Sequence, residues 1–285
     1  MTMVLKQKMQ GFYRLKVGKP GQEPRIDTGW FENLITDNGL DLMYTMPAGT
    51  FGIKYFCPKC CVGSGNTVPA FTDTTLASFV AVTGSPNAST FALAVFVDEA
   101  DAVPAYWKSI ASWRFATGTA AGNLAEIGVG ATETNLFSRA LIVDGGGSPT
   151  TITVLADEVL DVTYELRVYI DKTQVPITIS ISSVNYSGYT QPYNIDNPPD
   201  FSDAWTPTTS NANMALYVSS SHSEPPDVYS SFGGSQYLGS PTLISAYIPS
   251  TYYLDIRYTW VQSNANVSGG IQGFFTDFSF TKFMV

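Results

Sequence analysis

The segment that decides the fold reads GNLAEIGVGATETNLFSRALIVDGGGSPTTITVLADEVLDVTYELRVYI and spans residues 122–170. Its last part, residues 160–170, alternates between apolar and polar side chains almost without interruption. A period of two predicts a β-strand with one buried side and one side in water. The buried side would hold Leu160, Val162, Tyr164, Leu166, Val168 and Ile170, and the other side Asp161, Thr163, Glu165, Arg167 and Tyr169.

A second strand is predicted upstream, at residues 136–143. Between the two strands, DGGGSP at 144–149 predicts a turn, because glycine adopts positive φ and proline fixes φ. Strand, turn and strand would form an antiparallel unit, whose apolar side needs a second layer to cover it. The sequence therefore predicts an all-β fold made of one or more antiparallel β-sandwiches.

Alternation and turn signals predict further strands on both sides of this segment. They are expected at residues 11–17, 30–36, 51–62, 91–98, 109–117, 177–184, 214–219, 243–247, 252–261 and 270–283. Two short helical turns are expected, one at 40–46 with Asp37 as its N-cap residue and one at 73–77. The stretches 194–200, 206–213 and 219–231 are rich in Pro, Ser, Asn and Asp, which predicts long loops in the C-terminal part.

The composition fits a β protein that forms interfaces. A chain of 285 residues suffices for one large β domain or two ordinary ones. Hydrophobic residues make up 44% and charged residues only 14%, with 16 Tyr, 17 Phe and 5 Trp. Many aromatic and few charged residues suit strands and subunit interfaces. We expect a basic docking arm or strand at 1–28, a β platform domain at 29–172, and a C-terminal β domain with long loops at 173–285.

Charge is unevenly distributed along the chain. The net charge is −9, and from residue 173 onward it is −5 because two cations face seven acids. Residues 1–25 carry six cations and one acid, a net charge of +5. This segment is either a solvated basic strand or a docking arm held by an acidic surface of a neighbouring subunit. An arm could be removed without loss of folding. Its basic residues are Lys6, Lys8, Arg14, Lys16, Lys19 and Arg25.

Three kinds of partner or location are not expected. Beyond residues 1–25 the sequence has no basic segment, so we expect no nucleic-acid partner. The first ten residues, MTMVLKQKMQ, lack the apolar core of a secretion signal. The longest apolar run, residues 91–97, is too short to span a bilayer, so no membrane insertion is expected. We expect the chain to be made in a cytoplasm and kept there until assembly.

Cys57, Cys60 and Cys61 form the one cluster of soft metal ligands. A C-x-x-C pair is half of a zinc site, and the missing ligands would have to come from His222, the single histidine, or from another copy. The alternatives are buried free thiols, which pack as small hydrophobic groups, or a disulfide formed after cell lysis. Structural zinc needs four ligands, so we expect no metal and no cofactor.

Enzymatic chemistry has little support in the sequence. Ser-His-Asp catalysis would depend wholly on His222. The paired carboxylates of a glycosidase need only lie about 5–10 Å apart in space, but most acids here lie on strand faces or in turns, as solubility requires. We therefore expect no enzyme. Aromatic residues lie among Asn, Asp and Ser in the C-terminal part, a mixture that suits either sugar recognition or packing between subunits. The candidate binding residues are Tyr189, Tyr193, Trp205, Tyr217, Tyr229 and Tyr237.

Three blocks of the sequence resemble structural proteins of tailed-bacteriophage virions, usually described as tail or tail-fibre proteins. The first is GWFENLITDNGLD at 29–41, and the second is CVGSGNTVP at 61–69 followed by TDTTL at 72–76. The third and most specific comprises GNLAEIGVG at 122–130, LFSRALI at 136–142 and PTTITVLADE at 149–158. A weaker resemblance to the same family lies at residues 264–266 and 269–271.

The resemblance implies a virion subunit of the tail tip or a tail fibre, with no shared catalytic residues. It also implies a homo-oligomer, most often a trimer, that binds other phage tail proteins and contacts a glycan or receptor of the host surface. Two alternatives are a head-associated fibre or decoration protein and a carbohydrate-degrading tail enzyme. Residues 190–250 lie outside the resemblance, so specificity is expected there.

Overall fold

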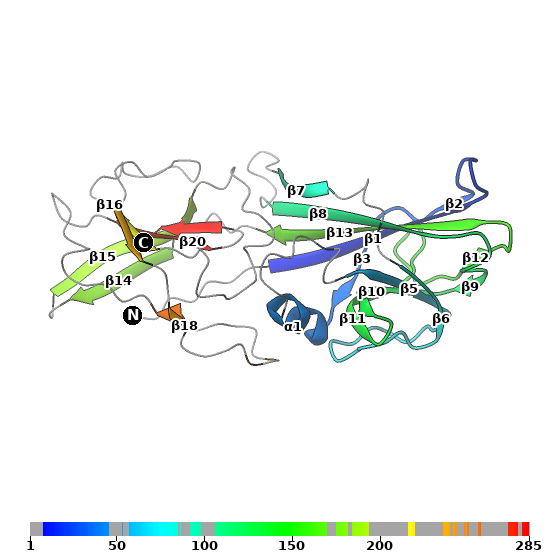
Figure 1. The fold of residues 1–285 in the computed structure, drawn as a ribbon, viewed down its shortest axis with the longest axis horizontal. Coiled ribbons are helices and arrows are strands. Elements are labelled where there is room, and N and C mark those ends of the chain that lie inside the picture. The colour runs from blue at the N-terminus through cyan, green and yellow to red at the C-terminus, as the bar shows by residue number, and fades with distance from the viewer. Residues whose placement is uncertain are drawn as a thin grey trace.

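The computed structural model describes residues 8–45, 53, 57–84, 86, 92–97, 106–169, 175–181, 184–193, 216–219, 236–239, 242–243, 248, 250, 256–257, 273–278 and 281–284. Within these residues the protein is mostly β, with antiparallel sheets and one short helix (Figure 1). The predicted fold class is therefore confirmed.

The first sheet, sheet A, is built on two long strands. β1 (Lys8–Gly18) and β13 (Val159–Tyr169) pair antiparallel along their full lengths. β8 (Tyr106–Phe115) pairs with the other side of β13, and β7 (Ala92–Val97) and β2 (Ile26–Asp27) end the sheet. β3 (Phe31–Glu32) also pairs with β1. The strand order β2-β1-β13-β8-β7 places β1 between two neighbours, so the N-terminal segment is part of the sheet.

The second sheet, sheet B, has the order β4-β11-β10-β5-β6. Its strands are β4 (Leu34–Ile35), β5 (Lys59–Gly63), β6 (Phe79–Thr83), β10 (Glu126–Thr132) and β11 (Asn135–Leu141). The helix α1 (Asp37–Thr45) follows β4 and packs beside β11. β9 (Gly122–Leu124) and β12 (Ile152–Val154) form a separate two-stranded sheet.

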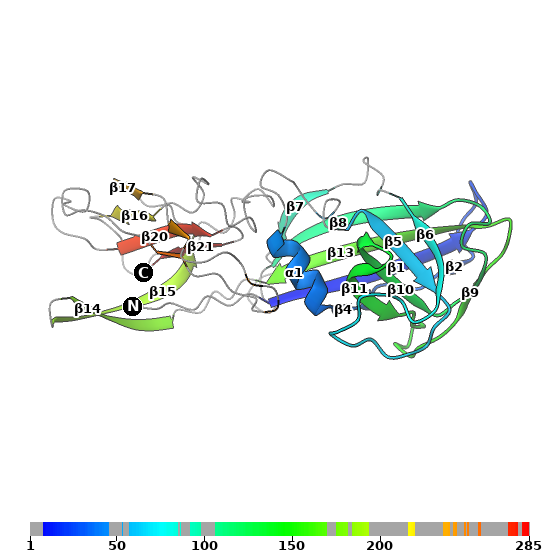
Figure 2. The same cartoon turned by 60° about the horizontal axis from the view of Figure 1, so that its bottom comes forward.

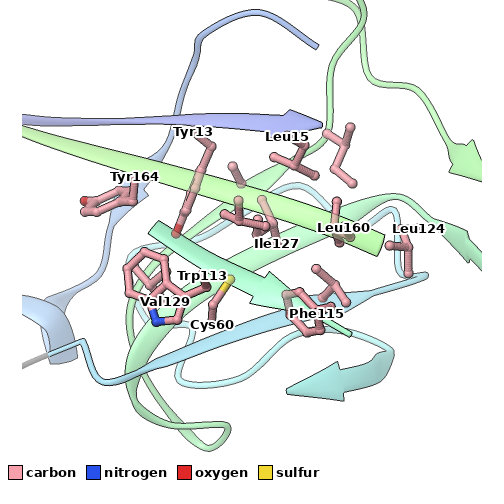
Figure 3. Packing of buried hydrophobic residues seen from close by; sticks show 14 of the residues in the cluster. Tyr13, Leu15, Cys60, Trp113, Phe115, Leu124, Ile127, Val129, Leu160 and Tyr164 are labelled. Carbon is pink, nitrogen blue, oxygen red and sulfur yellow. The ribbon is translucent and has the colours of Figure 1, made fainter. Parts of the chain in front are cut away.

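The core lies between sheets A and B. Side chains of β1 and β13 on one layer meet side chains of β5 and β10 on the other (Figure 3). β11 adds Phe137 and Ala140 to the same core. Tyr13, Leu15 and Tyr164 are fully buried, as are Ile127 and Val129 opposite them. Full burial of one such aliphatic side chain contributes about 1.5–3 kcal/mol, so this interface supplies most of the stability of the sandwich.

The predicted unit of strand, glycine turn and strand is wrong in its pairing. β11 belongs to sheet B and β13 to sheet A, so the two strands cover each other across the core rather than pairing edge to edge. The turn itself is present: the Asp144 amide donates to the carbonyl of Ser148 at 2.9 Å, and Gly147 has a φ of 82°. The chain then passes through β12 before it enters the opposite layer.

The predicted helix near residue 40 is present, but its cap is a different residue. The side-chain oxygen of Thr36 accepts the amide of Gly39 at 2.9 Å, so Thr36 and not Asp37 is the N-cap. The helical turn predicted at 73–77 is wrong, because those residues form turns and bends on the surface of sheet B. The strand predicted at 51–62 begins at Lys59, and Ile53 is helical.

Strands of the C-terminal part form sheets of their own. A six-stranded sheet has the order β14-β15-β21-β20-β16-β17, and β18 (Thr242–Leu243) pairs with β19 (Ile256–Arg257). The six strands are β14 (Val175–Ile181), β15 (Val184–Tyr193), β16 (Leu216–Ser219), β17 (Gln236–Gly239), β20 (Gly273–Phe278) and β21 (Thr281–Met284). The loops predicted at 194–200, 206–213 and 219–231 lie outside the described residues, apart from Ser219. Among the described helices, none has the length and apolar character that crossing a bilayer requires.

Candidate functional site

A long loop covers the outer face of sheet B. It comprises residues 64–78, between the end of β5 and the start of β6 (Figure 2), and we call it the clamped loop. Its base is closed by the Ser64 amide, which donates to the carbonyl of Ser78 at 2.8 Å. Beneath it, Leu76 of the loop packs on Cys61 and Leu136 of the sheet in a small buried cluster. The loop therefore adds a third layer to this side of the sandwich.

Glu126 of β10 fastens both ends of the clamped loop. Its carboxylate accepts the amide of Gly65 at 3.0 Å, the amide of Ser78 at 2.7 Å and the amide of Ala77 at 2.9 Å. The side chain has no exposed surface. A buried carboxylate needs such donors because an unpaired charge in the interior is strongly unfavourable.

Arg139 of β11 completes this buried centre. Its guanidinium donates to the Glu126 carboxylate at 2.9 Å, to the Asp73 carboxylate at 2.5 Å and to the carbonyl of Thr67 at 2.8 Å. Only 2% of the Arg139 side chain is exposed. One arginine thus joins the sheet to both the outgoing and the returning arm of the loop.

The start of α1 is attached to the same place. The Thr36 hydroxyl donates to the carbonyl of Leu136 at 2.9 Å, and the Leu136 amide donates to the carbonyl of Thr74 at 3.0 Å. The Asp37 amide donates to the carbonyl of Phe71 at 2.9 Å. Three separate parts of the sequence therefore meet around the clamped loop: the start of α1, the loop itself, and strands β10 and β11 beneath it.

The tip of the clamped loop is apolar and exposed. Val68 is 76% exposed and Phe71 is 60% exposed. The loop carries one charge, Asp73, and Arg139 neutralises it at 2.5 Å. Exposed apolar side chains in a charge-poor setting are typical of contact surfaces for other proteins. Chemically, this arrangement can hold an apolar loop in one conformation, and its two acids, Asp73 and Glu126, are both paired with Arg139.

The basic residues of the predicted docking arm pair mostly within their own chain. Arg14 makes a two-pronged ion pair with Asp27, at 2.8 and 2.6 Å, and Lys16 lies 3.7 Å from the same carboxylate. Arg14 and Lys16 hold the pKa of Asp27 down to about 2, chiefly through the hydrogen bond from Arg14. Lys8 begins β1 with its amine over the ring of Tyr169, and Lys6 lies outside the described residues.

Two further arm residues tie the turn after β1 to the start of β13. Lys19 lies 2.8 Å from the Asp157 carboxylate, and Arg25 donates to Glu158 at 2.7 Å and 2.8 Å. The hydrogen bond from Arg25, with one from the Leu155 amide, lowers the pKa of Glu158 to about 2. Removing residues 1–25 would also remove β1, so the expectation that the segment is dispensable for folding is corrected. A docking role for its cations stays a prediction.

The three cysteines are all buried thiols, and sheet B separates Cys61 from Cys57 and Cys60. Cys60 and Cys61 are consecutive in β5 and therefore point to opposite faces, Cys60 into the core and Cys61 under the clamped loop. Burial raises the pKa of the Cys57 and Cys60 thiols, and raises that of Cys61 to about 12. The described residues bring together no group of three His, Cys, Asp or Glu side chains that could hold a metal. His222 lies outside them.

The predicted aromatic binding residues are placed only in part. Tyr189 and Tyr193 belong to β15, and Tyr217 of β16 lies opposite Tyr237 of β17 in the strand register. Trp205 and Tyr229 lie outside the described residues. Whether these tyrosines bind a ligand therefore stays a prediction.

Sequence reasoning missed the residues that build the clamped loop. Glu126 and Arg139 each stand in a strand beside apolar residues, where a charged side chain on the outer face is ordinarily taken as solvated. The available signal was a pair of opposite charges, on adjacent strands, within the block that carries the most specific resemblance.

Comparisons with known proteins identify no relative of this chain. No family model, no curated protein and no solved structure matches this chain.

Proposed function

We propose that this chain is a structural subunit of a tailed-bacteriophage virion, in the tail tip or a tail fibre, and that its work is assembly. It would bind copies of itself and other tail proteins. The observation that carries the proposal is the clamped loop, where parts of all three blocks that resemble phage tail proteins come together around a buried Arg139–Glu126 pair.

Ordering a contact loop at the moment of binding costs conformational entropy. A free loop loses conformational entropy when it docks, and this loss weakens binding. Glu126, Arg139 and the cap of α1 hold the clamped loop in place before any partner arrives. Val68 and Phe71 can then be buried by a neighbouring protein without that penalty.

The C-terminal part supports a second element of the proposal. Residues 173–285 have a separate six-stranded sheet and lie largely outside the sequence resemblance. We assign contact with the host surface glycan or receptor to this part. The clamped loop, in contrast, would join the chain to the particle. A trimer remains the expected oligomer, as the resemblance implies.

Particle incorporation tests the proposal. The double variant Val68→Asp/Phe71→Asp is expected to fold normally but to enter purified particles at least about tenfold less than the unchanged chain. Leu155→Asp is the control, because Leu155 is 47% exposed and follows β12, outside the clamped loop. Mass spectrometry of gradient-purified particles measures both.

Two outcomes would contradict parts of the proposal. Normal incorporation of Val68→Asp/Phe71→Asp would remove the clamped loop as a docking element. Absence of the unchanged chain from purified particles would remove the virion role altogether.

A further inference from the structure

The outer face of sheet A carries a basic platform at one end. Its members come from three adjacent strands: Lys8, Gln10 and Phe12 of β1, Arg167 and Tyr169 of β13, and Lys108 of β8. The register places Gln10, Arg167 and Lys108 in one row across the sheet, and Lys8 beside Tyr169 in the next. Side chains directly opposite one another in a sheet lie on the same face.

Arg167 is held in position by its neighbours. Its guanidinium carbon lies 4.2 Å from the centre of the Phe12 ring and 4.7 Å from that of Tyr106. Its Nε donates to the Glu165 carboxylate at 2.6 Å, and 27% of the side chain remains exposed. A guanidinium has five N–H donors, so a fixed and accessible one can bind a second carboxylate.

The platform has more positive charge than its described surroundings balance. Three cations, Lys8, Lys108 and Arg167, lie near two acids, Glu165 and Glu32, because Glu32 of β3 pairs with Phe12. The local charge is therefore +1 (three minus two). Among the described residues, neither Lys8 nor Lys108 has a carboxylate within ion-pair distance. The cations at the other end of the same face differ, because Arg14, Lys16 and Arg114 all have acidic partners.

We propose that the basic platform is a docking surface for the acidic C-terminal part of a second copy of this chain. Residues 173–285 have a net charge of −5, and this charge is the complement that the platform lacks. The two surfaces differ, so the contact is head-to-tail, and head-to-tail contacts close into rings such as trimers. The proposal rests on the proposed assembly role and names the surfaces that would join the copies.

Salt and charge reversal test the platform with the full-length chain. Light scattering should show the oligomer at about 0.05 M salt and its dissociation at about 1 M, where screening is strong. Lys8→Glu/Lys108→Glu should weaken association by about tenfold or more. Lys59→Glu/Arg114→Glu makes the same change in net charge outside both the platform and the predicted arm, and should leave association nearly unchanged. Equal melting temperatures would show that the variants fold.

Cross-linking identifies the occupant. A photoreactive residue at position 108 in unlabelled copies, mixed with isotope-labelled copies, should give cross-links between copies that map to residues 173–285. Cross-links within one copy to the acidic residues at 98–101 would overturn the proposal. It would also be overturned if neither high salt nor Lys8→Glu/Lys108→Glu reduced the extent of assembly. If the platform proposal fails but the chain is found in purified particles, the proposed virion role stands. If the chain is absent from the particles, the virion role and the platform proposal are both contradicted.

Discussion

Replacing Arg139 by methionine tests the buried centre of the clamped loop most sharply. The substitution keeps much of the side-chain volume but removes the charge that faces Glu126, Asp73 and the carbonyl of Thr67. Glu126 has no exposed surface, so its carboxylate would remain as an uncompensated buried charge. Breaking a buried pair in this way costs about 3–5 kcal/mol. That is a large part of the roughly 5–15 kcal/mol that stabilises an ordinary domain.

Two companion variants separate charge from packing. Arg139→Met/Glu126→Gln removes both charges and keeps one side-chain oxygen for the loop amides, so it should recover about 1–2 kcal/mol of the loss. Arg114→Met is the control: its pair with Asp161 is at the surface, with Arg114 57% exposed, and should cost about 0–1 kcal/mol. Urea unfolding followed by circular dichroism gives the free energy of unfolding for each variant.

A small effect of Arg139→Met would refute this account of the buried centre. If Arg139→Met lies within about 1 kcal/mol of the unchanged protein, like the surface control, the pair does not hold the loop. Limited proteolysis adds a local readout, because residues 64–78 should become cleavable in Arg139→Met and stay resistant in Arg114→Met.

Three further predictions follow from other parts of the fold. The pKa values of Asp27 and Glu158 are lowered to about 2, so their stabilisation is present above the unfolded values near 4 and lost as the pH falls toward 2. Melting temperatures from pH 7 to about 2.5 should fall less steeply in Asp27→Asn/Glu158→Gln, and an unchanged slope would contradict this. Cys57 and Cys60 are fully buried with raised pKa values, so a thiol reagent should label them only after unfolding; rapid labelling of the native protein would show them accessible. Gly39→Ala should destabilise by at least about 2 kcal/mol although alanine favours helix, because its Cβ would lie 2.0 Å from the carbonyl oxygen of Phe137; a neutral result in thermal melts would contradict that packing.

The sequence predicted the strands well where one side of a strand faces the core and the other faces water. β13 is such a strand, and its apolar side from Leu160 to Val168 is buried as the alternation indicated. Strand pairing was not predictable from the same pattern. Alternation says which side is buried, but it does not say which strand lies alongside, and so β11 and β13 were wrongly placed in one unit.

The clamped loop shows why the candidate site was missed. Glu126 and Arg139 lie on the polar side of their strands, which local periodicity interprets as facing solvent. They are buried only because a loop 48 to 72 residues away in sequence folds over them. Such a long-range contact leaves no periodic signal in either strand.

The N-terminal segment illustrates a related ambiguity. A count of charges there suggested an arm, whereas Arg14 and Lys16 alternate with Tyr13, Leu15 and Val17 along β1. The charges belong to the water-facing side of an inner strand. Charge alone could not distinguish a docking segment from the outer face of a sheet. The basic platform lies on such an outer face and is also the proposed docking surface.

The location of the chain in the particle is the most direct test of the assembly account. Particles whose copies of this chain carry a short peptide tag can be labelled with antibody-coupled gold and imaged by electron microscopy. The account predicts gold at the tail of most particles, at its tip or along its fibres. Gold on the head would contradict the tail assignment, and unlabelled particles, with the tagged chain free in the lysate, would contradict the virion role itself.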